Sequence, residues 1–287
     1  MYNYSVIIPH RNSVSKLKRA LASIPKREDI EVIVIDNSTV KVDLSFLENL
    51  SHHKLLYSDI TKGAGHARNI GLDASCAKWI LFLDADDFFT KNAFSSFDNF
   101  INSEHEIIYF NSTSIIEGTK IESDRHIYYS KLVTEFIESR KRTDDSLRYR
   151  FYSPCLKLVN YDLIDRKNIR FDEVPASNDL MFSLKVGHFA KSVDADSSVV
   201  YCITLSQGSL TTTLSKINFK SRFKVAINQY KFMKAINRSD LKPFLMSRYL
   251  NSINYGFLTF SWCTKLIIKN RINIFLSFKS LLKQKLI

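Results

Sequence analysis

Residues Trp79–Asp87 read WILFLDADD, in which five apolar residues are followed by three acids within four positions. An apolar run of this length is typical of a strand that is buried on both faces. Carboxylates this close together repel one another, and one of them has to bind a proton unless a cation lies between them. Oxygen ligands of this kind suit Mg²⁺ or Mn²⁺. The stretch predicts a divalent cation at the end of a strand, although a helix start, where Asp is also favoured, stays an alternative.

On both sides of this stretch, the first hundred residues alternate between apolar strands and helical patterns. Strands are expected at Tyr4–Pro9, Glu31–Asp36, Lys54–Tyr57, Trp79–Leu83 and Ile107–Phe110, and helices at Ser13–Ile24, Leu44–Leu50, Ala64–Ala77 and Thr90–Ile101, the last capped by Thr90. Such alternation predicts an α/β fold with a parallel sheet and helices on both faces. Ligands of these sheets bind at the carboxyl ends of the strands, so the polar residues after each strand are candidates for a site.

A glycine-rich loop opens the helix that is expected between residues 64 and 77. Three of the chain's seven glycines, Gly63, Gly65 and Gly71, fall within nine residues. Gly63 and Gly65 would let the backbone approach a ligand closely, and Arg68 would lie in the first turn of the helix. Backbone N–H groups and a guanidinium together form an anion site. The loop and the acid cluster together predict a metal ion bound with a diphosphate; for the loop alone, a plain helix start is the alternative.

Four blocks of sequence carry a family resemblance: SVIIPHRN (5–12), EVIVIDNST (31–39), KGAGHARNIGLDAS (62–75) and WILFLDADD (79–87). In this order and spacing they resemble the nucleotide-binding half of glycosyltransferase family 2. The resemblance covers residues 4–88 and extends more weakly to SNDLMF (177–182) and GSLT (208–211). It implies a Rossmann-like GT-A fold and an inverting enzyme that uses a nucleotide-sugar donor.

The resemblance also implies roles for single residues of the nucleotide-binding half. Pro9 ends the first strand where the family contacts the base, and Asp36 matches the acid that hydrogen-bonds the base. Arg11 stands where many members have an aromatic residue that stacks on uracil. A guanidinium plane also stacks, so a uridine nucleotide is expected without being fixed. Gly63 and Arg68 would face the diphosphate.

The acids after the third strong strand match the family's DxD motif. Asp84 would face the ribose or the metal ion, and Asp86 would be the principal ligand of Mg²⁺ or Mn²⁺. Asp87 is the usual third acid, which orients the loop.

The catalytic base is expected in the second half, where family members commonly place a Glu-Asp pair at the start of a helix. The pair here is Asn178-Asp179. The resemblance assigns the base to Asp179, with Asp172 and Glu173 in reserve, and a mere capping role for Asp179 stays open. Ser209 and Thr211 match a late family motif near the donor phosphates, for which a turn is an equal alternative.

The chain combines a nearly neutral body with a basic tail. Residues 216–287 carry 15 Lys and Arg against one acid, whereas residues 1–215 carry 26 basic and 28 acidic residues. We expect a nucleotide-sugar-binding half (1–110), an acceptor-binding half of the same catalytic domain (111–215) and a basic, aromatic-rich helical extension (216–287). The charge of the tail favours a polyanion. Its interleaved aromatic residues favour an anionic membrane surface over nucleic acid, with a helical cap on the body as the alternative.

These features predict an inverting, metal-dependent transferase that moves a hexose or N-acetylhexosamine from a nucleotide-sugar, with UDP expected, to a glycan acceptor. The resemblance and the tail favour a lipid-linked acceptor in lipopolysaccharide, O-antigen or capsule synthesis. The sequence shows no secretory signal and no zinc-type cysteine spacing, so we expect a cytoplasmic enzyme on the inner face of the plasma membrane.

Two other classes stay open, as does the oligomeric state. A sugar nucleotidyltransferase should carry a glycine- and lysine-rich loop where PHRNSVSK follows the first strand. A catalytically silent protein that binds a nucleotide-sugar or a polyanion would leave the acid cluster and the glycine loop unexplained.

Overall fold

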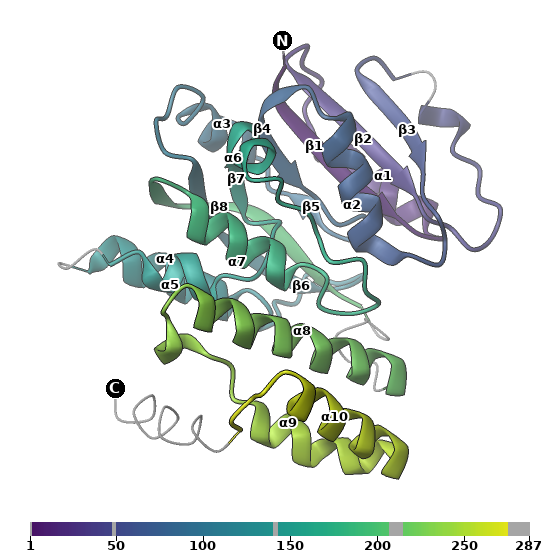
Figure 1. Ribbon diagram of the computed structural model, residues 1–287. Coiled ribbons are helices and arrows are strands. Elements are labelled where there is room, and N and C mark those ends of the chain that lie inside the picture. Colours follow the sequence, from purple (N-terminus) through teal and green to yellow (C-terminus); the bar gives the residue numbers. More distant parts are fainter. Residues whose placement is uncertain (1, 48–49, 140–142, 207–214, 275–287) are drawn as a thin grey trace. The chain divides into compact units, whose positions relative to one another are not determined.

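The protein is described by a computed structural model that covers residues 2–47, 50–139, 143–206 and 215–274 (Figure 1). Its chain forms two compact units. The first, which we call the sheet unit, comprises residues 1–173 and 178–209, and the second, the helical unit, comprises residues 174–177 and 210–287.

A mixed sheet organises the sheet unit, with the strand order β3-β2-β1-β4-β7-β6-β8-β5. The strands are β1 (Tyr2–His10), β2 (Ile30–Asp36), β3 (His53–Tyr57), β4 (Ala77–Phe82), β5 (Phe88–Phe89), β6 (Ile107–Ile116), β7 (Lys157–Asn160) and β8 (Val193–Leu205). The first four run parallel, and β1 to β4 agree with the predicted strands to within two residues.

The expected strands all run in one direction, since β4 and β6 are both antiparallel to β7, but the sheet is mixed because of two strands that were not predicted, β5 and β7. Strand β7 runs antiparallel to both of its neighbours, β4 and β6, and β5 runs antiparallel to β8. Hydrophobic runs predict where a strand forms, but direction depends on the route by which the chain returns to the sheet. Strand β7 has four residues and begins with a lysine, so its sequence carries little strand signal.

Helices cover both faces of the parallel part, as predicted. Helix α2 (Gly63–Ala74) packs closely on one face of the sheet at Gly71, where an added Cβ would lie 2.4 Å from the side chain of Ile7. Ile7 and Ile33 are register partners on one face, and side chains alternate along each strand, so Val32 points to the opposite face. There Val32 lines a cavity together with Leu21 of α1 (Val14–Ala22). Helices α1 and α2 therefore lie on opposite faces of the sheet.

The remaining helices of the sheet unit are α3 (Ala93–Asp98), α4 (Ile127–Glu138), α5 (Asp145–Arg150), α6 (Tyr161–Arg166) and α7 (Leu180–Phe189). Two expectations fail locally. The residues described in the expected helix 44–50 form only a 3-10 turn, Ser45–Leu47. Thr90 does not cap α3, because its hydroxyl donates to the carbonyl of Val199 at 2.6 Å and so ties the end of β5 to β8.

The helical unit has a hydrophobic core of its own. It contains α8 (Lys216–Ala235), η2 (Ser239–Leu241), α9 (Leu245–Asn251), η3 (Ser252–Tyr255) and α10 (Phe257–Lys269). Phe223 and Tyr230 of α8 pack with Leu245 of α9 and with Cys263 and Ile267 of α10. Within the described residues, no helix combines the length and the apolar character that crossing a bilayer requires.

Candidate active site

A buried arginine joins the acid loop to the second half of the sheet unit. Arg68 of α2 donates to Asp84 Oδ1 at 2.6 Å and to Asn178 Oδ1 at 2.8 Å. Its guanidinium also lies over the ring of Phe171, 5.4 Å from the centroid. Burial opposes the charge of Arg68, but the carboxylates of Asp84 and Asp179 raise its pKa. The geometry fixes one cation between two segments 94 residues apart in sequence.

The acid loop is a tight turn whose three carboxylates differ in role. Asp84 follows β4 with a side chain that is 38% exposed, and its carbonyl accepts a hydrogen bond from the backbone N–H of Asp87 at 2.9 Å. Asp87 is buried and accepts from the hydroxyl of Tyr201 at 2.9 Å and from the N–H of Thr204 at 2.7 Å. Asp87 therefore fastens the loop to β8, whereas Asp84 and Asp86 keep oxygen atoms for a ligand.

The three acids also oppose one another electrostatically. Burial, followed by the negative charge of Asp84, raises the pKa of Asp86. Burial, followed by the charges of Asp84 and Asp86, raises the pKa of Asp87 well above its usual range. Arg19 of α1 donates to the backbone carbonyl of Asp86 and so holds the loop without neutralising its carboxylate.

Asp36, at the end of β2, is held by a buried histidine. Its Oδ1 lies 2.8 Å from His10 Nδ1 and accepts from the hydroxyl of Ser38 at 2.6 Å. The backbone N–H of Ser13 donates to His10 Nε2 at 3.2 Å, so the imidazole proton is on Nδ1 and is donated to Asp36. The arrangement leaves Oδ2 of Asp36 for a further partner.

The loops beside Asp36 place the other base-contacting candidates. Pro9 pairs with Ile35 in the register of β1 and β2, and Arg11 is exposed in the loop that follows. Asn12 has a positive φ of 60° and accepts from the N–H of Thr39 at 2.8 Å, which closes this loop onto the one after β2. Pro9, Arg11 and Asp36 therefore lie at the carboxyl ends of two adjacent parallel strands.

The glycine loop approaches its own chain at one of its two glycines. Gly63 starts α2 with a φ of 75°, a conformation that favours glycine. A Cβ on Gly65 would lie 2.3 Å from the carbonyl oxygen of Asp172. Gly65 therefore makes room for backbone of the second half, whereas the sequence suggested that it makes room for a ligand. His66 Nδ1 lies 2.8 Å from Glu173 Oε1 and joins the same two segments.

Asp179 stands at the start of α7 without acting as its cap. It occupies the N-cap position with a φ of −83°, and its side chain makes no capping hydrogen bond. Burial raises the pKa of Asp179, and the positive charge of Arg68 opposes this effect. The absent capping bond leaves the carboxylate available for another task. Glu173, a reserve candidate for the base, is engaged with His66.

The model of "Glycosyl transferase family 2" matches residues 5–166, more than half of the chain. The chain belongs to glycosyl transferase family 2.

Relatives and solved structures agree with this membership. An uncharacterized glycosyltransferase of Haemophilus influenzae is 25% identical over 56% of this chain and 74% of its own. The minor teichoic acid biosynthesis protein GgaA of Bacillus subtilis is 36% identical over 36% of this chain, but only 26% of GgaA is covered. The crystal structure of Staphylococcus aureus TarS 1–349 in complex with UDP-GlcNAc aligns with a TM-score of 0.68 and 18% identity over 93% of this chain and 81% of TarS 1–349. This likeness shows the GT-A fold.

The donor set of this family 2 chain fits a divalent cation that is shared with a ligand. Within the described residues, no group of three or more His, Cys, Asp or Glu side chains is arranged to hold a metal ion. Magnesium is typically held by one or two carboxylates and by substrate phosphates, so two acids and a diphosphate suffice. Asp84 and Asp86 are the residues that would supply the carboxylates.

The contacts of two residues in the site were not predicted from the sequence. Tyr201 of β8 connects two acids, because its hydroxyl donates to Asp87 and accepts from the N–H of Asp84 at 3.2 Å. Lys157 of β7 is a buried lysine between the rings of Tyr109 and Phe151, each centroid 5.2 Å from its nitrogen. Burial lowers the pKa of Lys157 to about 7. Neither residue lies near a motif, so no local signal predicts these contacts. Ser209 and Thr211 lie outside the described residues.

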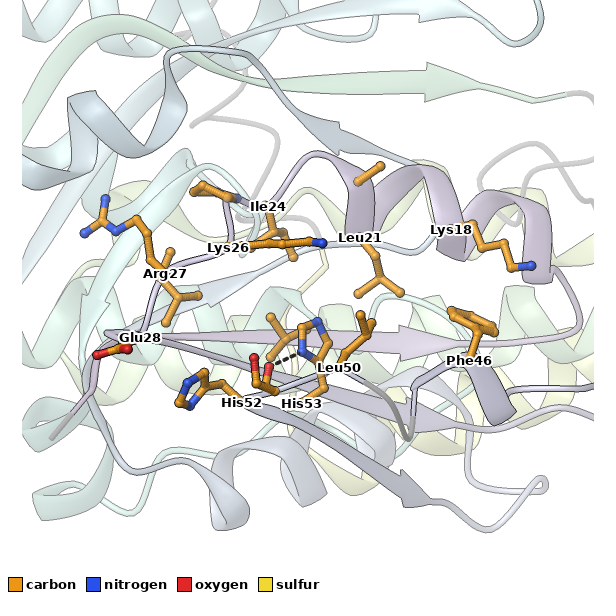
Figure 2. Close-up of a pocket in the computed structure, with 15 residues that line it drawn as sticks. Lys18, Leu21, Ile24, Lys26, Arg27, Glu28, Phe46, Leu50, His52 and His53 are labelled. Carbon is orange, nitrogen blue, oxygen red and sulfur yellow. Dashed lines mark hydrogen bonds between the residues drawn. The ribbon is translucent and has the colours of Figure 1, made fainter.

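A cavity of about 800 Å³ lies away from this chemistry (Figure 2). Leu21 and Ile24 of the α1 side line it together with Phe46 and Leu50, and Lys18 and Arg27 lie at its two ends. Ile30 and Val32, at the amino end of β2, complete the wall. Size alone would make this cavity a default ligand site. Among its described lining residues Glu28 is the one carboxylate, so the acid loop, and not this cavity, is the candidate active site.

Proposed function

We propose that this family 2 enzyme transfers a sugar from a nucleotide-sugar donor to a glycan hydroxyl with inversion of the anomeric centre. One observation carries the proposal: buried Arg68 bridges Asp84 of the acid loop and Asn178, the neighbour of Asp179. Donor-binding and base-supplying segments are thereby held around a single cation. Such an arrangement suits a reaction in which negative charge grows on a diphosphate leaving group.

Each residue then has a task in the reaction. Asp36 binds the base of the nucleotide through its second carboxylate oxygen, and Pro9 and Arg11 border the base. Gly63 and Arg68 face the diphosphate. Asp84 and Asp86 would hold Mg²⁺ or Mn²⁺, which when bound neutralises charge on the departing diphosphate.

Asp179 is the proposed general base. Its carboxylate takes the proton of the acceptor hydroxyl as the hydroxyl oxygen bonds to the anomeric carbon. The bond from that carbon to the diphosphate oxygen breaks on the opposite face, and the nucleoside diphosphate leaves. A single displacement of this kind inverts the anomeric centre, so an α-linked donor gives a β-linked product. Asn178, where family members commonly have Glu, is occupied by Arg68 and does not compete for the proton.

The donor is proposed to be a UDP-sugar, with UDP-N-acetylglucosamine as the first to test. A fold neighbour, TarS of Staphylococcus aureus, has been solved in complex with UDP-GlcNAc. The exposed guanidinium of Arg11 can stack on a pyrimidine. A hexose in place of the N-acetylhexosamine fits the same carboxylates and arginine.

The acceptor is proposed to be a lipid-linked glycan of a bacterial surface polysaccharide, such as lipopolysaccharide, O-antigen or capsule. GgaA, a relative over part of its length, takes part in minor teichoic acid biosynthesis by name. The basic extension 216–287 would hold the enzyme on the cytoplasmic face of the plasma membrane. The division of the chain at residues 110 and 215 stays a prediction.

Donor turnover tests the proposal directly. We expect Mn²⁺- or Mg²⁺-dependent hydrolysis of UDP-N-acetylglucosamine, measured as UDP release, and thermal stabilisation by UDP only with the metal ion. Asp86→Ala should lower UDP release at least 100-fold, because a metal-clamped diphosphate contributes several kcal/mol to the transition state. Asp165→Ala, at an exposed acid of α6, is the matched control and should leave the rate unchanged.

The opposite result has a clear meaning. If UDP-, GDP-, CMP- and dTDP-sugars all fail to stabilise the protein with Mn²⁺ or Mg²⁺, the chain is not a working transferase. Binding of a nucleotide-sugar without turnover would instead support the catalytically silent alternative.

A further inference from the structure

A cluster of large apolar side chains is exposed at one end of the α9–α10 hairpin, which we call the apolar tip. It consists of Leu250 of α9, Ile253 of η3, and Phe257 and Leu258 at the start of α10, which are 55%, 57%, 80% and 75% exposed. Figure 1 shows α9 and α10 lying side by side in the helical unit. Single exposed apolar residues are common, but four within nine positions form a patch that needs a partner.

The turn that carries the apolar tip is a built structure. Gly256 has a φ of 94°, which only glycine adopts without strain. The hydroxyl of Ser252 donates to the carbonyl of Tyr249 at 2.5 Å, and that of Thr259 to the carbonyl of Tyr255 at 3.0 Å. Both hydroxyl-bearing residues are fully buried. The buried polar groups hold the backbone, so Phe257 and Leu258 are directed outward by a fixed turn.

The apolar tip is also anchored from within the helical unit. The ring of Tyr255 stacks on Phe219 of α8, with the centroids 4.3 Å apart. Such aromatic stacking stabilises the turn against collapse onto the core. The exposed side chains therefore cannot fold back without breaking contacts that the unit already makes.

The charge around the tip identifies the partner. Tyr249–Thr264, sixteen residues, contains no charged side chain, while Arg248 precedes it and Lys265 follows it. Across residues 216–274 the unit carries twelve Lys and Arg against one acid, Asp240, which pairs with Arg238 at 3.0 Å. An apolar tip inside a cationic surface matches the boundary between anionic headgroups and acyl chains.

We propose that the apolar tip inserts into the interface of an anionic bilayer, with Phe257 and Leu258 below the headgroups and the flanking cations among them. This proposal rests on the proposed function, in which the enzyme acts on a lipid-linked acceptor at a membrane surface. A second copy of the chain is disfavoured, because pairing two tips would bring two strongly cationic surfaces together. Nucleic acid would satisfy the cations but not the aliphatic side chains of the tip.

Vesicle binding tests the insertion. The probe is vesicles of phosphatidylcholine with 30% phosphatidylglycerol, sedimented with the full chain at 0.15 M salt. The double variant Phe257→Ser/Leu258→Ser should bind at least tenfold more weakly than the unchanged protein. Ile268→Ser is the matched control, because Ile268 is 70% exposed on the same helix but about 15 Å from the tip. This control should bind like the unchanged protein.

A second variant keeps the test informative if the double variant is poorly folded. Phe257→Trp retains the apolar character, and brominated acyl chains should quench its added fluorescence only with anionic vesicles. Unchanged vesicle binding by the double variant, or an absence of quenching, would overturn the proposal. Concentration-dependent dimers that the double variant abolishes would overturn it in favour of self-association.

Donor turnover separates this inference from the proposed function. The double variant should hydrolyse UDP-N-acetylglucosamine at the rate of the unchanged protein, since the tip holds none of the proposed site residues. If the unchanged protein binds vesicles but shows no donor turnover, the insertion of the apolar tip is supported and the transferase proposal fails. Turnover without tip-dependent vesicle binding would support the transferase and overturn the membrane insertion of the tip.

Discussion

The sheet unit and the helical unit use charge in opposite ways. In the sheet unit, two buried charges form ion pairs: Arg68 pairs with Asp84, and fully buried Glu31 pairs with Lys54 at 2.9 Å. In the helical unit one acid stands among twelve cations over residues 216–274, so most of those cations have no carboxylate of their own unit to pair with. A charge removed from water needs a partner, whereas a charge at the surface does not.

The difference shows what each unit can be used for. Paired and buried charges fix side-chain geometry, and a site that must orient a diphosphate and a proton acceptor needs that precision. Surface cations that outnumber the acids of their unit attract an external anion over a distance set by salt. This difference supports our proposals that the chemistry takes place in the sheet unit and that the helical unit attaches the enzyme to a membrane.

The largest expected effect tests whether Asp179 belongs to the chemistry. Asp179→Asn should lower the transfer rate about 10³-fold, the usual contribution of a positioned general base, while UDP binding changes little. The base works only when ionised, and burial raises its pKa, so the rate of the unchanged enzyme should fall as pH drops through this raised pKa. The measurement is a pH profile of transfer to a water-soluble acceptor.

The same substitution at another helix start supplies the control. Asp162→Asn alters an exposed acid in the first turn of α6 and should leave the rate within a factor of two. Near-normal turnover by Asp179→Asn would show that Asp179 is not the general base.

The parallel half of the fold could be predicted because each strand carries its own signal. Strands β1, β2 and β4 are buried apolar runs, and the polar residues that follow them are adjacent in sequence to the strand ends. The place of Asp84 and Asp86 after a buried strand could be predicted for the same reason, whereas their roles stay a prediction. Features that a strand's own residues encode can be predicted from the sequence alone.

The rest of the sheet and site depends on contacts between distant segments. Strand β5 has two residues, so no periodicity can be recognised in it. Tyr201 binds Asp87 across 114 positions, and nothing around either residue predicts the other. Lys157 has the sequence neighbourhood of a surface lysine, and only the fold reveals that two rings enclose it.

Lys157 differs from Arg68 and Glu31 because, in the part of the chain that the structure describes, it is buried without an ion pair. It donates to the carbonyl of Phe151 at 3.0 Å, but among the described residues it forms no ion pair with a carboxylate. Burial lowers its pKa to about 7, against about 10.4 in an unfolded chain. Below pH 7, where the lysine is charged in both states, this difference lowers the free energy of unfolding by about 5 kcal/mol. Lys157→Met removes this cost but also removes the hydrogen bond to the carbonyl of Phe151, which becomes unsatisfied. The substitution should therefore raise the free energy of unfolding by about 2 kcal/mol at pH 6.

The pH dependence of this gain distinguishes burial from a general packing effect. Between pH 7 and pH 10 the unfolded lysine binds a proton that the folded one does not, so the unchanged protein becomes more stable as pH rises. The advantage of Lys157→Met should shrink over this window in urea titrations. A constant advantage from pH 6 to pH 10 would show that the lysine is not desolvated.

The smallest expected effect lies in the helical unit, where a cap rather than a charge is at stake. Ser215 is the N-cap of α8, and its hydroxyl accepts from the N–H of Asn218 at 3.1 Å. Ser215→Ala should lower the stability of the helical unit by about 1 kcal/mol and leave transfer to a soluble acceptor unchanged. The two tryptophans separate the units, since Trp79 lies in β4 and Trp262 in α10. In Trp79→Phe, tryptophan fluorescence during urea unfolding reports on the helical unit, and in Trp262→Phe it reports on the sheet unit. A loss seen equally by both reporters would mean that the units unfold together, so that a defect at the start of α8 also destabilises the sheet unit.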